Sequence, residues 1–156
     1  MENSIQLDDL NRRILRALQR DASLTATELA NVVASSPASC WRRVRSLEDG
    51  GVLQGAVRLV NRQALNQDID VMCSLRLKSH SEADAKVFEQ FVADQDNILE
   101  CYTVSGEWDY LLRIVAADIR GYEHFLMRTL LRHPAVASAN SQFALSRVKY
   151  TTAVPV

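Results

Sequence analysis

The stretch SPASCWRRVRSLEDGG, residues 36–51, predicts a single helix with both ends marked. Ser36 is a good N-cap, and Pro37 suits the first helical position because its missing N–H costs nothing there. The glycine pair at 50 and 51 favours the left-handed conformation in which many helices end. Three apolar side chains recur at helical spacing and predict the buried face: Cys40, Val44 and Leu47.

The opposite face of this helix is polar and basic. Ser39, Arg42, Arg43 and Ser46 follow one another at i, i+3, i+4 and i+7, and Arg45 adds a cation at the edge. No acidic residue occurs between positions 29 and 47. Such a helix fits the major groove of DNA. The alternative is a solvated basic helix face, and this stretch alone does not decide between them.

The preceding sequence predicts two more helices. Apolar residues from position 7 to 18 mark one face of a helix over about 8–20. Thr25 and Glu28 then form a capping-box pattern that begins a second helix over about 26–34. Three short helices with a tight turn before the third indicate a helix-turn-helix. Trp41 is expected to pack beneath the first helix rather than to contact a groove.

Residues 52–59 predict two short strands around Gly55, as in a small hairpin or wing, from which Arg58 could touch a phosphate. The polar residues 61–68 then predict a linker.

The remaining sequence alternates between strand and helix patterns. Strands are expected over 69–77, 98–104, 110–115 and 136–145, with helices that begin after the N-caps Ser81 and Asp118. The order strand, helix, strand, strand, helix, strand is that of the ferredoxin-like fold. Apolar side chains point to both faces of the sheet, which predicts that a second copy covers the face without helices.

Composition narrows the possible functions. The chain has 156 residues and a net charge of −1, so any nucleic-acid binding must come from local charge. Its three cysteines show no paired spacing and predict buried free thiols in a reducing cytoplasm. There is no signal-peptide pattern and no apolar run of membrane-spanning length. No metal-ligand spacing, cofactor motif or catalytic set stands out, since His80, His124 and His133 are isolated.

These patterns together resemble the leucine-responsive regulatory protein/AsnC (feast/famine) family of transcription regulators. The N-terminal likeness lies in LDDLNRRILRALQRDASLTATELA and SPASCWRRVRSLEDGGVLQG, and the C-terminal likeness in VSGEWDYLLRI and LLRHPAV. The resemblance implies an α+β protein with a winged helix-turn-helix domain (1–60), a linker (61–68) and a ferredoxin-like, ACT-like sensing domain (69–156). It also implies dimers that pair through the sheet and assemble into tetramers or octamers.

Two sets of site residues follow. For double-stranded DNA we expect contacts from Ser36, Ser39, Arg42, Arg43, Arg45 and Arg58. The loop that contains Ser105, Gly106, Glu107 and Asp109 could capture an amino acid, with backbone N–H groups for the carboxylate and acidic side chains for the ammonium. The alternative is a tight polar loop with solvated acids. By resemblance the effector pocket also draws on Thr103, Tyr110, Ile119, Leu131, Gln142 and Ala144, some from a neighbouring subunit.

The leading hypothesis is a cytoplasmic, nucleoid-associated, sequence-specific transcription regulator tuned by a small amino acid, without enzymatic activity, metal or cofactor. Its two-fold dimers predict a pseudo-palindromic operator. One alternative is an architectural DNA-binding protein with little effector control. Another is a small enzyme or enzyme-regulating module.

Overall fold

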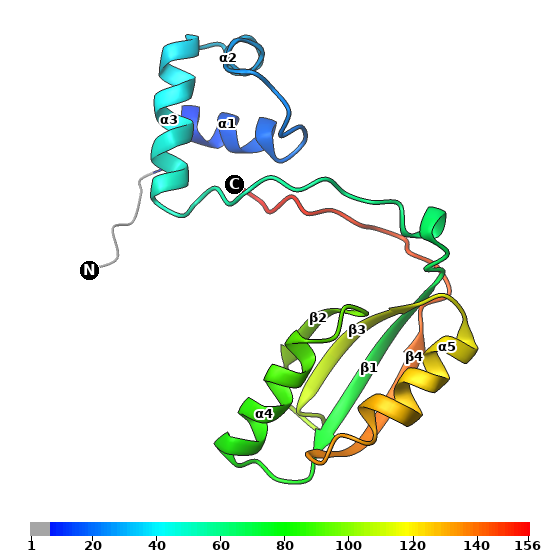
Figure 1. Cartoon of the computed structure of the whole chain (residues 1–156). Helices are drawn as coiled ribbons and strands as arrows, with labels where there is room; N and C mark the ends of the chain where they lie inside the picture. Colours follow the sequence, from blue (N-terminus) through cyan, green and yellow to red (C-terminus); the bar gives the residue numbers. More distant parts are fainter. Residues whose placement is uncertain (1–6) are drawn as a thin grey trace. The chain divides into compact units, whose positions relative to one another are not determined.

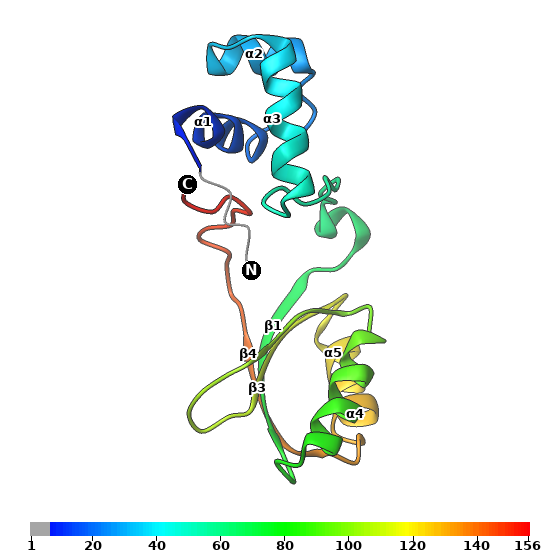
Figure 2. The ribbon, with the colours of Figure 1, turned by 90° about the vertical axis from the view of Figure 1, so that its left-hand side faces the viewer.

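The computed structural model describes residues 7–156 and divides them into two compact units (Figures 1 and 2). One unit contains the described residues 7–59 together with residues 149–156, and the other contains residues 60–148. The sequence placed the last eight residues with the C-terminal domain, whereas the structure groups them with the N-terminal one. No helix in the part of the chain that is described is long and apolar enough to cross a membrane.

The N-terminal unit contains the three expected helices, α1 (Asp9–Leu18), α2 (Ala26–Val33) and α3 (Pro37–Asp49). Each begins at a side-chain cap, and those of α2 and α3 are the caps that the sequence predicts. Asp8 accepts from the backbone N–H of Asn11, and both bonds of the Thr25–Glu28 capping box are present. The buried side chains of this unit form one core: Ile14, Leu15, Ala17, Leu29, Ala30, Val33, Cys40 and Leu47.

The expected hairpin after α3 is not formed. Residues 52–60 contain no strand and are mostly exposed, so the prediction of two paired strands around Gly55 was wrong. Alternating apolar residues indicate a strand only where a partner strand accepts the backbone hydrogen bonds. No strand occurs anywhere in the described part of this unit, residues 7–59 and 149–156.

The C-terminal tail packs on α1. The side-chain amide of Gln19 accepts from the Val154 N–H at 2.7 Å and donates to the Val154 carbonyl oxygen at 3.1 Å. Arg16 donates to the carbonyl oxygen of Val156 at 2.6 Å, and the Val156 side chain contacts the helical core. The backbone of the tail is therefore held by hydrogen bonds with the Arg16 and Gln19 side chains, and the Val156 side chain adds an apolar contact.

The second unit has the ferredoxin-like order β1 (Ile69–Leu77), α4 (Glu82–Ala93), β2 (Ile98–Thr103), β3 (Tyr110–Ala116), α5 (Ile119–Phe125) and β4 (Val136–Phe143). The sheet has the order β2-β3-β1-β4, and all its pairs are antiparallel. Both helices cover one face of the sheet (Figure 2). The α+β fold that the sequence predicted is confirmed.

Two details of this unit differ from the prediction. The linker contains a short 3-10 helix, η1 (Arg62–Leu65). The expected last helix changes after Phe125 into a π-helical turn, η2 (Leu126–Leu130), in which the Leu131 N–H donates to the Leu126 carbonyl at 2.9 Å. Apolar periodicity at 3.6 residues per turn does not reveal this change, because Tyr122 and Leu130 are buried as a continuous α-helix would also bury them.

The sheet face without helices carries apolar side chains, as expected. Leu111 lies opposite Tyr102 on the neighbouring strand, and Tyr102 is 54% exposed. Leu99 and Val104 on and beside the same strand are also exposed.

Candidate functional site

The outer surface of α3 differs from the predicted face in one respect. The Ser36 hydroxyl accepts from the Ser39 N–H at 3.2 Å, which fixes the start of the helix. Arg42 is exposed and makes no hydrogen bond or ion pair within residues 7–156. Arg43, the next residue, lies on a different side and is only 29% exposed.

Arg43 connects α3 to the start of α1. Its Nη1 donates to the Asp8 carboxylate at 2.7 Å and to the Asn11 side-chain oxygen at 2.9 Å. The Asn11 N–H, followed by the Arg43 guanidinium, lowers the pKa of Asp8 below its ordinary value of 3.8. The outward placement expected for Arg43 was therefore wrong, since its partners lie some thirty positions earlier in the chain. Helical spacing carries no information about such a contact.

The other expected DNA contacts remain accessible. Arg45 lies 3.9 Å from Glu48 and 3.6 Å from Asp49, and all three side chains are largely exposed. Such surface pairs contribute about 0–1 kcal/mol, so a phosphate can replace the carboxylates. Arg58 is exposed on the extended segment that replaces the expected wing.

Trp41 is not buried beneath α1 as the sequence suggested. Its side chain is 66% exposed and lines a cavity of about 370 Å³ together with Leu18, Leu53 and others. Residues from the end of α1, from α2, from the length of α3 and from the segment after α3 line this cavity. The sequence could not indicate the cavity, because the segment after α3 was expected to form a hairpin.

In the second unit the loop after β2 is held by Asp109. The Asp109 carboxylate accepts from the Leu77 N–H at 2.7 Å, and its own N–H donates to the Leu75 carbonyl at 2.8 Å. The Asp109 carbonyl accepts from the Val104 N–H at 3.0 Å, while Gly106 between them has φ of +109°. Glycine suits this conformation because it lacks a Cβ. Asp109 therefore extends the pairing of β1 with β3 and closes the loop.

Arg76, which the sequence analysis did not single out, holds the other acid of this loop. Its guanidinium donates to the Glu107 carbonyl at 2.9 Å and to the Glu107 carboxylate at 3.1 Å, and it lies 5.4 Å from the centre of the Trp108 ring. Arg76 lies at one of the polar positions that alternate with apolar ones along β1. Its contact with the loop depends on a register that the sequence does not give.

The ten predicted effector residues do not meet in one chain. Seven lie toward the end of β1 that contains Leu75: Thr103, Ser105, Gly106, Glu107, Asp109, Tyr110 and Leu131. Ile119, Gln142 and Ala144 lie toward the other end, where Gln142 pairs with Met72 and the Ala144 N–H donates to the Asp70 carbonyl. Leu75 and Asp70 are separated by roughly 16 Å of strand.

Two of these residues, Thr103 and Tyr110, line a hollow of about 320 Å³ between the sheet and α4. Glu89, Val92, Ala93 and Cys101 complete its lining. The Tyr110 hydroxyl donates to Glu89 at 2.9 Å, and burial together with this carboxylate raises the pKa of Tyr110 to about 12. The phenol therefore stays protonated at neutral pH and serves as a hydrogen-bond donor.

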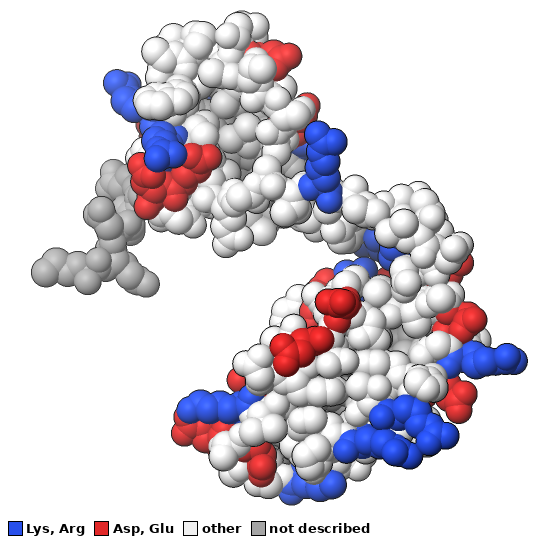
Figure 3. All heavy atoms as spheres, in the orientation of Figure 1, with Lys and Arg blue, Asp and Glu red and all other residues white. Residues whose placement is uncertain are grey.

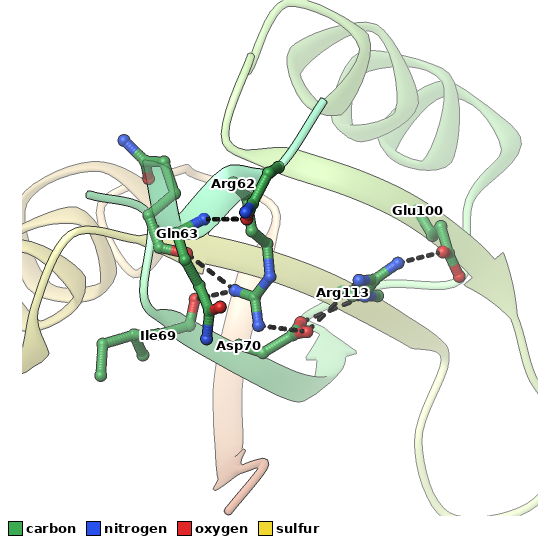
Figure 4. Close-up of polar contacts among 8 residues, drawn as sticks. Arg62, Gln63, Ile69, Asp70, Glu100 and Arg113 are labelled. Carbon is green, nitrogen blue, oxygen red and sulfur yellow. Dashed lines mark hydrogen bonds and ion pairs between the residues drawn. The ribbon is translucent and has the colours of Figure 1, made fainter. Parts of the chain in front are cut away.

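A charge cluster, defined here as Arg62, Asp70, Glu100 and Arg113, joins the linker to the sheet (Figure 4). Arg113 contacts both Asp70 carboxylate oxygens, at 3.1 and 3.3 Å, and Glu100 at 2.7 Å. Arg62 lies 3.2 Å from Asp70, whose side chain is only 7% exposed. The Arg113 guanidinium lowers the pKa of Glu100. The sequence gives no sign of this cluster, because Asp70 occupies an ordinary polar position in the alternation of the strand.

The cysteines are free, as predicted. Cys40 and Cys73 are buried, whereas Cys101 is half-buried, and burial raises the pKa of the Cys73 and Cys101 thiols. Within residues 7–156, no three His, Cys, Asp or Glu side chains are grouped so that they could hold a metal ion.

Comparison with known proteins assigns both units. Residues 7–54 match the model of winged helix-turn-helix DNA-binding domains, and residues 70–154 match that of the Lrp/AsnC ligand binding domain. The chain belongs to the Lrp/AsnC family. Members of this family are DNA-binding transcriptional regulators. The helical unit is therefore the DNA-binding domain, and the sheet unit is the ligand-binding domain.

Curated relatives agree over nearly the whole Lrp/AsnC chain. The leucine-responsive regulatory protein of Rhizobium meliloti (strain 1021) is 36% identical over 93% of this chain and 93% of its own. The transcriptional activator DecR of Escherichia coli (strain K12) is 31% identical over 96% of this chain and 99% of its own.

Solved structures agree with the fold as well. A transcriptional regulator from Neisseria meningitidis in complex with L-Met has a TM-score of 0.93 and 33% identity, covering 96% of this chain and 97% of that one. An AsnC family regulator from Agrobacterium tumefaciens has a TM-score of 0.90 and 38% identity, covering 95% and 96%.

Proposed function

We propose that this Lrp/AsnC regulator reads a specific operator through α3. The observation that supports this most strongly is Arg42, an exposed arginine without a partner in residues 7–156, on a helix that is fixed at its start by Ser36. An arginine in this position can bond guanine O6 and N7 together. Ser36, Ser39, Arg45 and Arg58 supply further contacts to phosphate or base.

Arg43 has a different role in this proposal. Its bonds to Asp8 and Asn11 set the angle between α3 and α1, and thereby the direction in which Arg42 extends. We therefore treat Arg43 as a positioning residue. Removing it should lower operator affinity indirectly, through a less fixed helix.

The effector is a small amino acid bound between two copies of the chain. One chain brings Thr103, Ser105, Gly106 and Tyr110 to one end of the sheet, whereas Ile119, Gln142 and Ala144 lie at the other. Only a second protomer can bring the two groups together. The Neisseria meningitidis relative was solved with L-Met, which supports an amino acid as the class of ligand.

Pairing through the exposed sheet face would make the protein at least a dimer, and stacking of dimers would give a tetramer or octamer. Tyr102 and Leu99 supply apolar area for the first contact. Effector binding would then change the spacing of the recognition helices on a pseudo-palindromic operator. Such a protein acts in the cytoplasm, on the nucleoid, and needs no catalytic activity.

The test combines a ligand screen with operator binding. Each of the common amino acids is added to the full chain in a thermal-shift experiment, where a ligand at 100 times its Kd stabilises by ~2.7 kcal/mol. The stabilising amino acid should then change operator affinity and leave binding to non-operator DNA unaltered. If no amino acid shifts the melting temperature, or if the footprint stays equally long and strong with all of them, the effector proposal is rejected.

A further inference from the structure

The segment from α5 through η2 to the turn that follows carries a row of basic side chains that the function described above does not use. This basic row is Arg120, His124, Arg128 and Arg132, spaced four residues apart and all exposed. Figure 3 shows Lys and Arg side chains gathered over this helix. None of the three arginines makes a hydrogen bond or ion pair within residues 7–156.

The π-helical turn limits how far the side chains of this row drift around the helix axis. In a continuous α-helix, residues four apart drift around the axis, because one turn holds 3.6 residues. The turn η2 closes a hydrogen bond from Leu131 to Leu126, five residues apart, and so holds more residues per turn. The drift from Arg120 to His124 is thereby reversed toward Arg128, which lies in η2.

The other helix on the same face of the sheet has the opposite charge. The helix α4 carries Glu82, Asp84 and Glu89, and the Nζ of its single lysine, Lys86, lies 2.7 Å from Glu82. Along α5 and η2 the one acid is Glu123, because Asp118 caps the helix start. The charge is therefore separated between the two helices, with unpaired arginines on one of them.

We propose that the basic row is a second contact surface for duplex DNA, which grips the phosphate backbone without reading sequence. From Arg120 to Arg132 the row extends roughly 18 Å. Over that length B-DNA presents about ten phosphate charges. Guanidinium groups suit phosphates because they donate in a planar fork. The inference rests on DNA binding by the N-terminal unit, which brings a duplex to the protein.

The experiment compares two charge-matched double variants of the full chain. One is Arg128→Gln with Arg132→Gln in the row, and the other is Lys78→Gln with Lys86→Gln, two lysines of the same unit outside the row. Affinity is measured against salt on an operator-length duplex and on one several helical turns longer. On the longer duplex the row variant should lower the slope of log K against log salt by roughly 2 per protomer in contact. The lysine variant should keep the wild-type slope.

Further variants make the outcome decisive. Glu123→Gln should tighten binding to the longer duplex, because it removes the acid beside the row. The proposal is overturned if both double variants show the wild-type slope, or if the row variant only lowers the assembly mass in sedimentation, which would make the row a contact between copies. Failure of Arg42→Ala to weaken operator binding would instead count against the proposed function.

Discussion

The arginines of α3 and those of the charge cluster show two opposite uses of one side chain. Arg42 is exposed and unpaired within residues 7–156, whereas Arg113 is mostly buried and bonds to both Asp70 and Glu100. An exposed guanidinium can exchange water for phosphate at little cost. A buried one that already satisfies two carboxylates cannot. The difference is one of environment, and it separates a side chain that is open to a ligand from one that holds the sheet unit together.

Breaking the charge cluster should have the largest effect on stability. The variant Asp70→Ala removes the carboxylate that Arg62 and Arg113 share, on a side chain that is only 7% exposed. We expect the free energy of unfolding to fall by about 3–5 kcal/mol, because buried charges are left uncompensated. Urea denaturation at fixed protein concentration measures it. Asp49→Ala, which removes an exposed partner of Arg45, is the control and should cost less than ~1 kcal/mol. A loss of that small size for Asp70→Ala would contradict the comparison.

Removing the exposed arginine should act on binding and spare stability. Arg42→Ala is expected to weaken operator binding by about 1–3 kcal/mol, more than it weakens binding to unrelated DNA. Its unfolding free energy should stay within about 0.5 kcal/mol of wild type. Arg43→Ala should instead lower stability by up to about 1 kcal/mol and weaken operator binding only indirectly, because α3 is less firmly fixed to α1. Titrations of both variants with operator and unrelated duplexes decide this, and an equal loss on both DNAs would make Arg42 a phosphate contact.

The helix caps should have similar effects in the two units, since each acts locally. Thr25→Ala removes the capping box of α2, and Ser81→Ala removes the cap of α4. Each should cost about 1 kcal/mol in the free energy of unfolding. Thr25→Ser, which keeps the hydroxyl, is the matched control for α2. If Thr25→Ala were as stable as wild type, the capping box would not contribute to stability.

The smallest expected effect is the response of the Asp8–Arg43 contact to acid. In the folded protein the pKa of Asp8 is lowered, so the ionised carboxylate stabilises the fold at pH values above its ordinary pKa of 3.8. This contribution is lost as the pH falls below that value through the folded pKa. Arg43→Met should therefore show a shallower loss of stability between neutral pH and pH 3 than wild type. Parallel curves for the two proteins would exclude this contact as a source of acid sensitivity.

Local signals explain why much of the fold could be predicted. The caps at Thr25, Ser36, Ser81 and Asp118 each depend on residues within one helical turn, and each is present in the structure. The alternation from Ile69 to Leu77 predicted β1 to the residue, because every second side chain from Val71 to Leu77 is buried. The hairpin after α3 was mispredicted for the complementary reason, since its residues have the right pattern and no partner strand.

The candidate site divides in the same way. The sequence by itself determined the helix α3, with its ends, its buried stripe and its exposed Arg42, because these follow from neighbours a few residues apart. Only the tertiary structure decided that Arg43 bonds to Asp8, that Arg76 holds the Glu107 loop and that Arg62 and Arg113 share Asp70. In each case the partner lies far away in sequence or across a strand register. Electrostatic contacts of that kind depend on distances that only the folded chain sets.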